Sequence, residues 1–176
     1  MKTVFKQDGD ITLRPLEVDD AEFLHEIINH NDVRAFLSRA PTPVSLESQK
    51  EYIREETSKD NYTHFLIEYK GEKAGHIYLG SLENDYRRSS VGYSVHPDFQ
   101  EQEICSKALK LVVEYAFETL NRHKIKGGYI DGNEASRRVM EKSGFQKEGV
   151  ERDFKYVDGE WKNVIWMSIL EDEYYE

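Results

Sequence analysis

The sequence predicts an α/β protein whose sheet is mixed and mostly antiparallel. Two observations predict this fold class: strand-like and helix-like segments alternate in the middle of the chain, and strand-like segments pair as hairpins at both ends. No repeat, low-complexity tract or linker rich in proline, glycine or serine divides the 176 residues. That length fits one domain of about 100 to 200 residues, so we expect a single domain over residues 1–176.

The composition is that of a folded protein with an excess of acid. Lys+Arg 24 against Asp+Glu 34 leave a formal net charge of -10, while 38% of the residues are hydrophobic and 12% are aromatic. A disordered acidic chain carries fewer apolar and aromatic residues. Binding a nucleic-acid backbone requires clustered Lys and Arg, so the acid excess argues against a broad nucleic-acid surface.

The cysteine, the histidines and the apolar runs of the sequence indicate which covalent links, metal sites and cellular compartments to expect. Cys105 is the only cysteine, so neither an intrachain disulfide nor a multi-cysteine metal site can form. The six histidines are scattered without a His-x-x-x-His pair, and we expect no metal. The N-terminus lacks an apolar signal-peptide core, and no run of about 18 apolar residues occurs. We therefore expect a cytoplasmic protein that does not enter a membrane.

The N-terminal third predicts one strand and two helices. Residues 11–16 alternate between apolar and polar as a strand does. Asp19 or Asp20 is placed to cap the helix that follows. Ser45 is placed to cap a second helix, which we expect to run to about Thr57.

The middle of the chain predicts a hairpin, a strand and the clearest helix. Residues 65–69 and 74–79 flank the turn at 70–72 and predict the hairpin. Residues 89–95 predict a further strand. The helix follows from apolar residues at i, i+4, i+7, i+8, i+11 and i+12, which are Ile104, Ala108, Leu111, Val112, Tyr115 and Ala116.

The C-terminal third predicts a strand, a short helix and a closing hairpin. Residues 125–130 suit a strand, and residues 133–142 suit a helix that Gly144 ends. Residues 146–156 and 161–170 then pair around a turn. Three aromatic residues of this hairpin are expected to pack into the core: Tyr156, Trp161 and Trp166.

Two segments place polar groups that could bind a ligand at the start of a predicted helix. At residues 96–109 a strand ends and the long helix begins, and the start of a helix exposes unpaired N–H groups that bind anions. At residues 133–149 Asn133 and Ser136 stand three positions apart, on a similar face of the short helix. Both side chains also suit simple capping of that helix, and this alternative stays open from the residues alone.

Together these segments resemble the GNAT superfamily of acetyl-CoA-dependent N-acetyltransferases, in particular its branch of ribosomal-protein N-terminal acetyltransferases. The resemblance covers nearly the whole chain. It includes Leu-Arg-Pro-Leu at 13–16 and Val-Gly-Tyr at 91–93, and its most specific part is Asn-x-x-Ser at 133–136 followed by Met-Glu-Lys-Ser-Gly-Phe at 140–145. It implies the GNAT fold, a sheet of about seven strands that splays in the middle, flanked by about four helices.

The resemblance also implies a reaction and a binding site. A neutral primary amine attacks the thioester carbonyl of acetyl-CoA, the co-substrate, and no metal takes part. Ser136 would donate a proton to the leaving thiolate, and the loop at 100–105 would hold the pyrophosphate. The residues implied to bind the cofactor are Tyr93, Ser94, Val95, Gln100, Gln102, Glu103, Ile104, Cys105, Ser106, Asn133 and Ser136.

The sequence departs from the family pattern in that loop. Glu101, Glu103 and Cys105 occupy positions where the family has glycine or another small residue. A glutamate adds bulk and negative charge beside a phosphate, although acids in a first helical turn also complement the helix dipole. Two alternatives follow: an enzyme that tolerates the acids, or a GNAT-fold binding or regulatory protein with impaired CoA binding. Cys105 suits the small-residue position, with a nucleophilic thiol as its alternative role.

The base and the acceptor are less well defined. Members of this branch often have a glutamate where this chain has Ser90. Glu83 or Asp85 in the preceding turn could act as base through water, with a surface acid as the alternative for each, and Glu83 is the candidate. The expected acceptor is a protein N-terminus or a small amine such as a polyamine. The loops between residues 29 and 62 and the closing hairpin would determine it, and a homodimer stays open.

Overall fold

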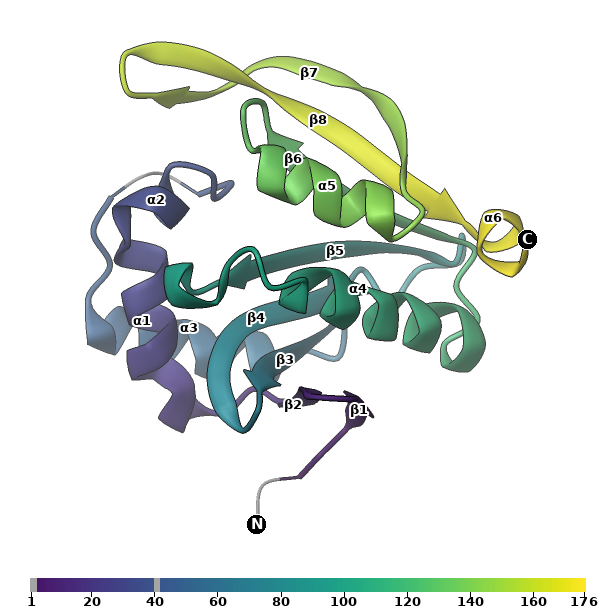
Figure 1. Ribbon diagram of the computed structural model, residues 1–176, viewed down its shortest axis with the longest axis horizontal. Helices are drawn as coiled ribbons and strands as arrows, with labels where there is room; N and C mark the ends of the chain where they lie inside the picture. Colours follow the sequence, from purple (N-terminus) through teal and green to yellow (C-terminus); the bar gives the residue numbers. More distant parts are fainter. Residues whose placement is uncertain (1–2, 40–41) are drawn as a thin grey trace.

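The computed structural model describes residues 3–39 and 42–176. In these residues eight strands form one sheet in the order β1-β2-β3-β4-β5-β6-β8-β7 (Figure 1). Neighbouring strands are antiparallel except for the parallel pair β5 and β6, which confirms the mixed, mostly antiparallel sheet. The strands are β1 (Lys6–Asp8), β2 (Ile11–Pro15), β3 (Tyr62–Tyr69), β4 (Glu72–Gly80), β5 (Arg88–Val95), β6 (Lys124–Ile130), β7 (Gln146–Val157) and β8 (Glu160–Leu170).

The helices include the four that the sequence predicts and two short additions. They are α1 (Ala21–Asn29), α2 (Asn31–Arg34), α3 (Leu46–Thr57), α4 (Ile104–Glu114), α5 (Glu134–Lys142) and α6 (Glu171–Tyr175). The additions are α2 and α6, and β1 is the strand beyond the expected seven. All three additions have five residues or fewer, so they carry too little periodicity to stand out in a sequence. The single domain over residues 1–176 stays a prediction, which the one sheet from Lys6 to Leu170 supports.

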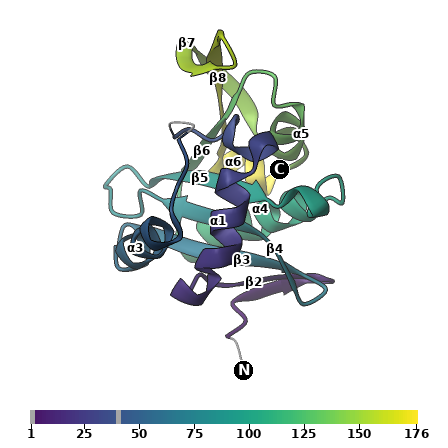
Figure 2. The same cartoon turned by 90° about the vertical axis from the view of Figure 1, so that its left-hand side faces the viewer.

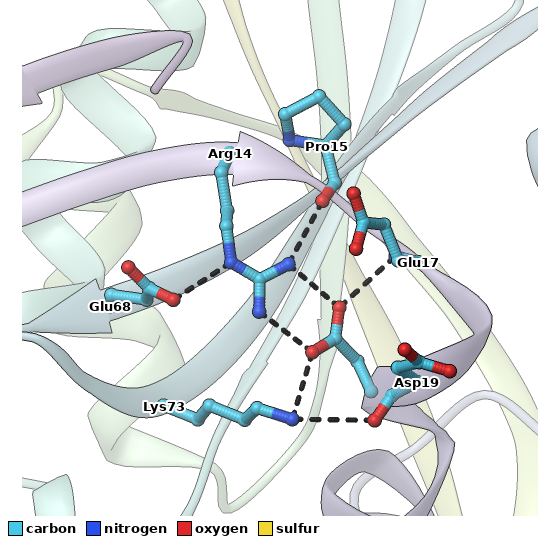
Figure 3. Close-up of polar contacts among 7 residues, drawn as sticks. Arg14, Pro15, Glu17, Asp19, Glu68 and Lys73 are labelled. Carbon is cyan, nitrogen blue, oxygen red and sulfur yellow. Dashed lines mark hydrogen bonds and ion pairs between the residues drawn. The ribbon is translucent and has the colours of Figure 1, made fainter. Parts of the chain in front are cut away.

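The predicted helix caps have different outcomes. Ser45 and Asn133 both cap as predicted, because their side chains accept hydrogen bonds from Ser48 N and Ser136 N at 3.1 Å. Asp20 precedes α1 but makes no side-chain cap there, so the prediction of an aspartate cap is wrong. Its carboxylate instead receives two hydrogen bonds from Arg14, at 2.7 and 2.8 Å, in a buried cluster of charged groups (Figure 3).

Helices cover both faces of the sheet. Figure 2 shows α3 on one side of the strands and α4 and α5 on the other. The alternation of side chains along β3 produces the two cores, because Phe65 and Ile67 pack with α4 while Leu66 packs with α1 and α3. All three side chains are at most 3% exposed.

The sheet opens between β5 and β6. Within the described residues these strands pair at only three positions, from Arg88 with Lys124 to Ser90 with Lys126. Beyond that point β5 continues against β4, and β6 continues against β8. Gly127 lies at the opening, where an added Cβ would meet Met140 Cε of α5 at 2.8 Å. The expected splay is therefore confirmed, and α5 packs closely across it.

The closing hairpin departs from the prediction of a packed aromatic cluster. Tyr156 is 54% exposed and Trp161 59% exposed, so the prediction that they pack in the core is wrong. They pack against each other near the hairpin tip, with ring centroids 5.4 Å apart.

In the part of the chain that is described, none of the helices is long and apolar enough to cross a membrane.

Candidate functional site

A cleft of about 930 Å³ follows the opening between β5 and β6. Its walls come from the end of β5, the loop that leads into α4, the first turns of α5, and the segment around α2. In Figure 1 the loop before α4 and the helix α5 lie on opposite sides of this opening. The cleft therefore brings the N-terminus of α4 together with the end of β5, the start of α5 and the segment around α2.

The loop before α4 keeps a glycine-like backbone without glycine. Glu101 and Glu103 both have left-handed backbones, with φ of 62° and 59°. Glycine adopts this conformation at the least cost, so these two glutamates keep the backbone that the resemblance leads one to expect of glycine. Among the described residues no side chain caps the start of α4 at Glu103. The first N–H groups of α4 are therefore available to an anion in the cleft.

The charge of Glu103 is balanced by a lysine on the opposite wall. Lys142 of α5 donates a hydrogen bond to Glu103 Oε1 at 2.5 Å. This bond and the positive charge of Lys142 lower the pKa of the Glu103 carboxyl. Both side chains are more than half exposed, at 62% and 56%. The repulsion expected between Glu103 and a phosphate is therefore reduced by a partner that solvent can reach.

A half-buried pair of hydroxyl groups lines the cleft. The Tyr93 hydroxyl of β5 and Ser136 Oγ of α5 are 2.9 Å apart, and either can be the donor. Ser136 is held by its place in the helix, because its N–H donates to the Asn133 cap. Burial raises the pKa of Tyr93, so its hydroxyl stays protonated at neutral pH. The capping and cleft-lining positions of Asn133 and Ser136 are thus compatible.

Cys105 lies beside this pair and behaves as an inert small residue. Burial raises the pKa of its thiol well above the ordinary value. Nucleophilic cysteines have lowered pKa values, because the thiolate is the reactive form. The geometry therefore supports packing at the small-residue position over nucleophilic chemistry.

The structure brings most of the sequence-predicted residues together. Every residue predicted to bind the cofactor lines the cleft, from Tyr93 on β5 to Ser136 on α5. Glu83 is placed elsewhere: it lies exposed in the turn between β4 and β5, and its N–H donates to Asn61 Oδ1 at 2.9 Å. Among the described residues Glu83 is not part of the cleft wall.

Several cleft residues were not predicted from the sequence, among them Asp32, Val33, Phe36, Leu37 and Tyr129. The first four lie in and after α2, inside the loops expected to determine the acceptor, but no motif distinguishes them. Tyr129 follows Gly128 on β6, where alternation predicts only a strand residue.

The cleft fits the pantetheine and pyrophosphate of CoA. Beyond Ser90 the edge of β5 that faces β6 has no strand partner within the described residues, so its backbone groups are available to an extended ligand. The uncapped start of α4 supplies N–H groups for a phosphate at one end of the same cleft. In the described residues no group of three or more His, Cys, Asp or Glu side chains could hold a metal ion.

Comparison with known proteins gives consistent results. Residues 10–146 match the family described as acetyltransferase (GNAT) domain. The chain is 33% identical over 175 residues to the "Putative ribosomal N-acetyltransferase YdaF" of Bacillus subtilis (strain 168), with 96% of each chain covered. It is 28% identical over 164 residues to the spermidine N(1)-acetyltransferase of Escherichia coli (strain K12), with 93% of this chain and 88% of that one covered.

A solved structure supports the fold. The crystal structure of spermidine N-acetyltransferase from Vibrio cholerae in complex with CoA and spermine matches with a TM-score of 0.87 at 22% identity, over 96% of this chain and 100% of that chain. The matches favour the enzyme over the alternative of a binding or regulatory protein with impaired CoA binding. The prediction of an N-acetyltransferase that uses acetyl-CoA is confirmed. The chain belongs to the GNAT acetyltransferase family.

Proposed function

We propose that this protein transfers the acetyl group of acetyl-CoA to a primary amine on a protein N-terminus or a small molecule such as a polyamine. One observation carries the proposal: a single cleft joins the uncapped start of α4, the Tyr93 and Ser136 hydroxyls and the segment around α2. Relatives named for ribosomal and for spermidine acetylation support both acceptor classes.

The residues of the cleft divide the work of the reaction. Bound acetyl-CoA would supply the acetyl group as a thioester, whose C–S bond breaks as the C–N bond to the amine forms. Ser136 holds a proton at Oγ and donates it to the departing sulfur. Tyr93 fixes the direction of that hydroxyl through the 2.9 Å contact. Asn133 positions Ser136 as the cap of α5 and lines the same cleft.

The amine must also lose a proton during the reaction. Glu83 remains the candidate base, and its place in an exposed turn requires water to connect it with the amine. A Glu83→Gln variant tests this: a kcat lowered by about 100-fold supports the role, and an unchanged kcat contradicts it. The cytoplasmic location and a homodimer likewise stay predictions.

Two measurements test the proposed function directly. Calorimetric titration with acetyl-CoA should give saturable heat, and thiol release should be observed with either spermidine or a short peptide that has a free N-terminus. The peptide and the polyamine distinguish the two acceptor classes. Absence of binding heat up to millimolar acetyl-CoA would contradict the proposal.

The role of Ser136 has a matched control on the same helix. We expect Ser136→Ala to lower kcat by about 100-fold, because a positioned proton donor contributes about 10²- to 10⁴-fold. The KM for acetyl-CoA should change little. Ser143→Ala removes a hydroxyl at the other end of α5 that bonds only Val139 O in the described structure, and it should leave kcat unchanged. Equal kcat values for both variants would exclude Ser136 as the donor.

A further inference from the structure

The end of α2 is held by a lysine from the opposite end of the chain. Lys155 of β7 donates hydrogen bonds to three backbone oxygens, those of Arg34, Ala35 and Leu37, at 3.0, 3.2 and 2.6 Å. These carbonyls use all three hydrogens of the ammonium group. Lys155 is only 7% exposed, which is rare for a lysine unless its charge is satisfied.

The segment that Lys155 holds cannot fix its own position. α2 has only four residues, far fewer than an isolated helix needs to be stable. The carbonyls at the end of a helix also have no partners within it. Hydrogen bonds to a charged donor are the strong ones. Lys155 therefore supplies the partners that the end of α2 lacks.

A bulge in the closing hairpin places Lys155 at this point. Glu151 pairs with Val164, and the next pair is Lys155 with Lys162. Between these two pairs β7 advances four residues and β8 advances two. Asp153 in the bulge has a left-handed backbone, with φ of 51°, and its N–H donates to Asn163 Oδ1 at 3.0 Å. Bulges bend a strand and redirect its side chains. In Figure 1 the hairpin reaches the side of the molecule on which α2 lies.

The held segment forms part of the cleft wall. Val33, Phe36 and Leu37, here called the apolar wall, line the same cleft as the start of α4. Under the proposed function the phosphates lie at the start of α4 and the thioester lies near Ser136. The rest of the cleft, which the apolar wall lines, is then left for the amine.

We propose that Lys155 is a positioning residue for the acceptor: it ties the closing hairpin to the end of α2 and so fixes the apolar wall. The proposal rests on the proposed function for the direction of the cleft. Lys155 lies outside residues 10–146, which match the family. It does not contact the reacting atoms, so its removal should alter acceptor binding more than chemistry.

Steady-state kinetics of Lys155→Met test the proposal, with Lys162→Met as the matched control. Lys162 is the cross-strand neighbour of Lys155, but its side chain is 37% exposed and pairs only with Glu160 among the described residues. With whichever probe supports wild-type turnover, spermidine or the peptide, we expect Lys155→Met to raise the acceptor KM roughly tenfold, as the loss of charged hydrogen bonds predicts. The KM for acetyl-CoA should stay within about twofold, as should both constants of Lys162→Met.

The outcomes separate positioning from simple loss of fold. A purely structural defect lowers the active fraction, which reduces apparent kcat without separating the two KM values. Equal changes in both KM values, or an unchanged acceptor KM, would overturn the proposal, whereas an inactive wild type would overturn the proposed function instead. Hydrogen exchange at residues 31–37 gives a readout without turnover: exchange should accelerate in Lys155→Met and not in Lys162→Met.

A second variant covers the case in which Lys155→Met does not fold. Phe36 is 39% exposed, so Phe36→Ala should fold normally. It should raise the acceptor KM and leave the acetyl-CoA KM unchanged, because it removes part of the apolar wall itself. An unchanged acceptor KM in Phe36→Ala would also overturn the proposal.

Discussion

Two ionic clusters in this protein differ mainly in their contact with water. In the N-terminal half, Arg14 and Asp20 are 2% and 1% exposed and form a two-bond pair, with Lys73 and Glu68 at its edges (Figure 3). At the mouth of the cleft, Glu103 and Lys142 form one bond and are both more than half exposed.

This difference in exposure distinguishes ion pairs that stabilise the fold from ion pairs whose partner a ligand can replace. Breaking one partner of a buried pair leaves an uncompensated charge in a medium of low dielectric, which is costly. An exposed pair is solvated on both sides, so exchanging one partner for another anion costs little. Lys142 is therefore available to a phosphate in the cleft, whereas Arg14 is committed to the connection between β2 and α1.

Removing one charge from the buried cluster should have the largest effect on stability. We expect Asp20→Asn to lower the free energy of unfolding by about 3 kcal/mol, because the amide leaves Arg14 without its two-bond partner. Urea denaturation at pH 7 measures this. Glu160→Gln, which breaks an exposed pair with Lys162, should not move the urea midpoint. Equal midpoints for the two variants would remove the distinction between buried and exposed clusters.

The pH dependence of the free energy of unfolding tests the same cluster, because acid removes the charge of Asp20 and leaves its side chain in place. Burial alone would raise the pKa of Asp20, but hydrogen bonds from Arg14, Lys73 and the Glu17 backbone outweigh it and lower the pKa from 3.8 to about 2. A carboxyl whose pKa is lower in the folded state stabilises that state above the unfolded pKa. This contribution, about 2 kcal/mol, should be lost as the pH falls from about 4 to 2. The wild type should therefore lose about 2 kcal/mol more of its free energy of unfolding over this pH range than Asp20→Asn does. Parallel pH curves for the two proteins would contradict the assignment.

The fold was largely predictable because its main elements have strong local signals. The periodic helix α4, the Ser45 and Asn133 caps and both hairpins appear in the structure as expected. The failures occur where another side chain competes for a group that the local pattern assigns to a cap. Asp20 has the right residue type and position for a cap, but Arg14, six residues away in sequence, binds its carboxylate instead.

The site was predictable where a motif marks it and not where packing creates it. Ser136 and the loop before α4 come from motifs, and both line the cleft. The partner of Glu103 comes from a helix 39 residues further along the chain, so a local pattern could not identify it. The contact of Lys155 with α2 depends on a bulge, and alternation along β7 does not reveal that bulge.

The Tyr93 and Ser136 hydroxyls form a third polar contact, which is half-buried and uncharged. We expect Tyr93→Phe to lower the free energy of unfolding by about 1 kcal/mol, the usual contribution of a neutral hydrogen bond. The kcat should fall by about tenfold, because Ser136 loses the group that orients its hydroxyl. Chemical denaturation and steady-state kinetics measure the two effects. A loss of stability with unchanged kcat would show that the contact is structural and does not direct Ser136.

The exposed pair should show the smallest effect on stability and the opposite effect on the ligand. Glu103→Gln removes a negative charge beside the phosphate site and frees Lys142, so acetyl-CoA affinity should rise about two- to fivefold. The urea midpoint should not change, because solvent already surrounds both side chains.

Salt screens exposed charges, so the gain in affinity should shrink between low and high ionic strength. Calorimetry at both salt concentrations measures it, with Glu160→Gln as the control for loss of an exposed acid distant from the cleft. If Glu103→Gln instead weakened acetyl-CoA binding, the pair would be needed to hold the loop before α4 in place, and the two clusters would differ in burial but not in role.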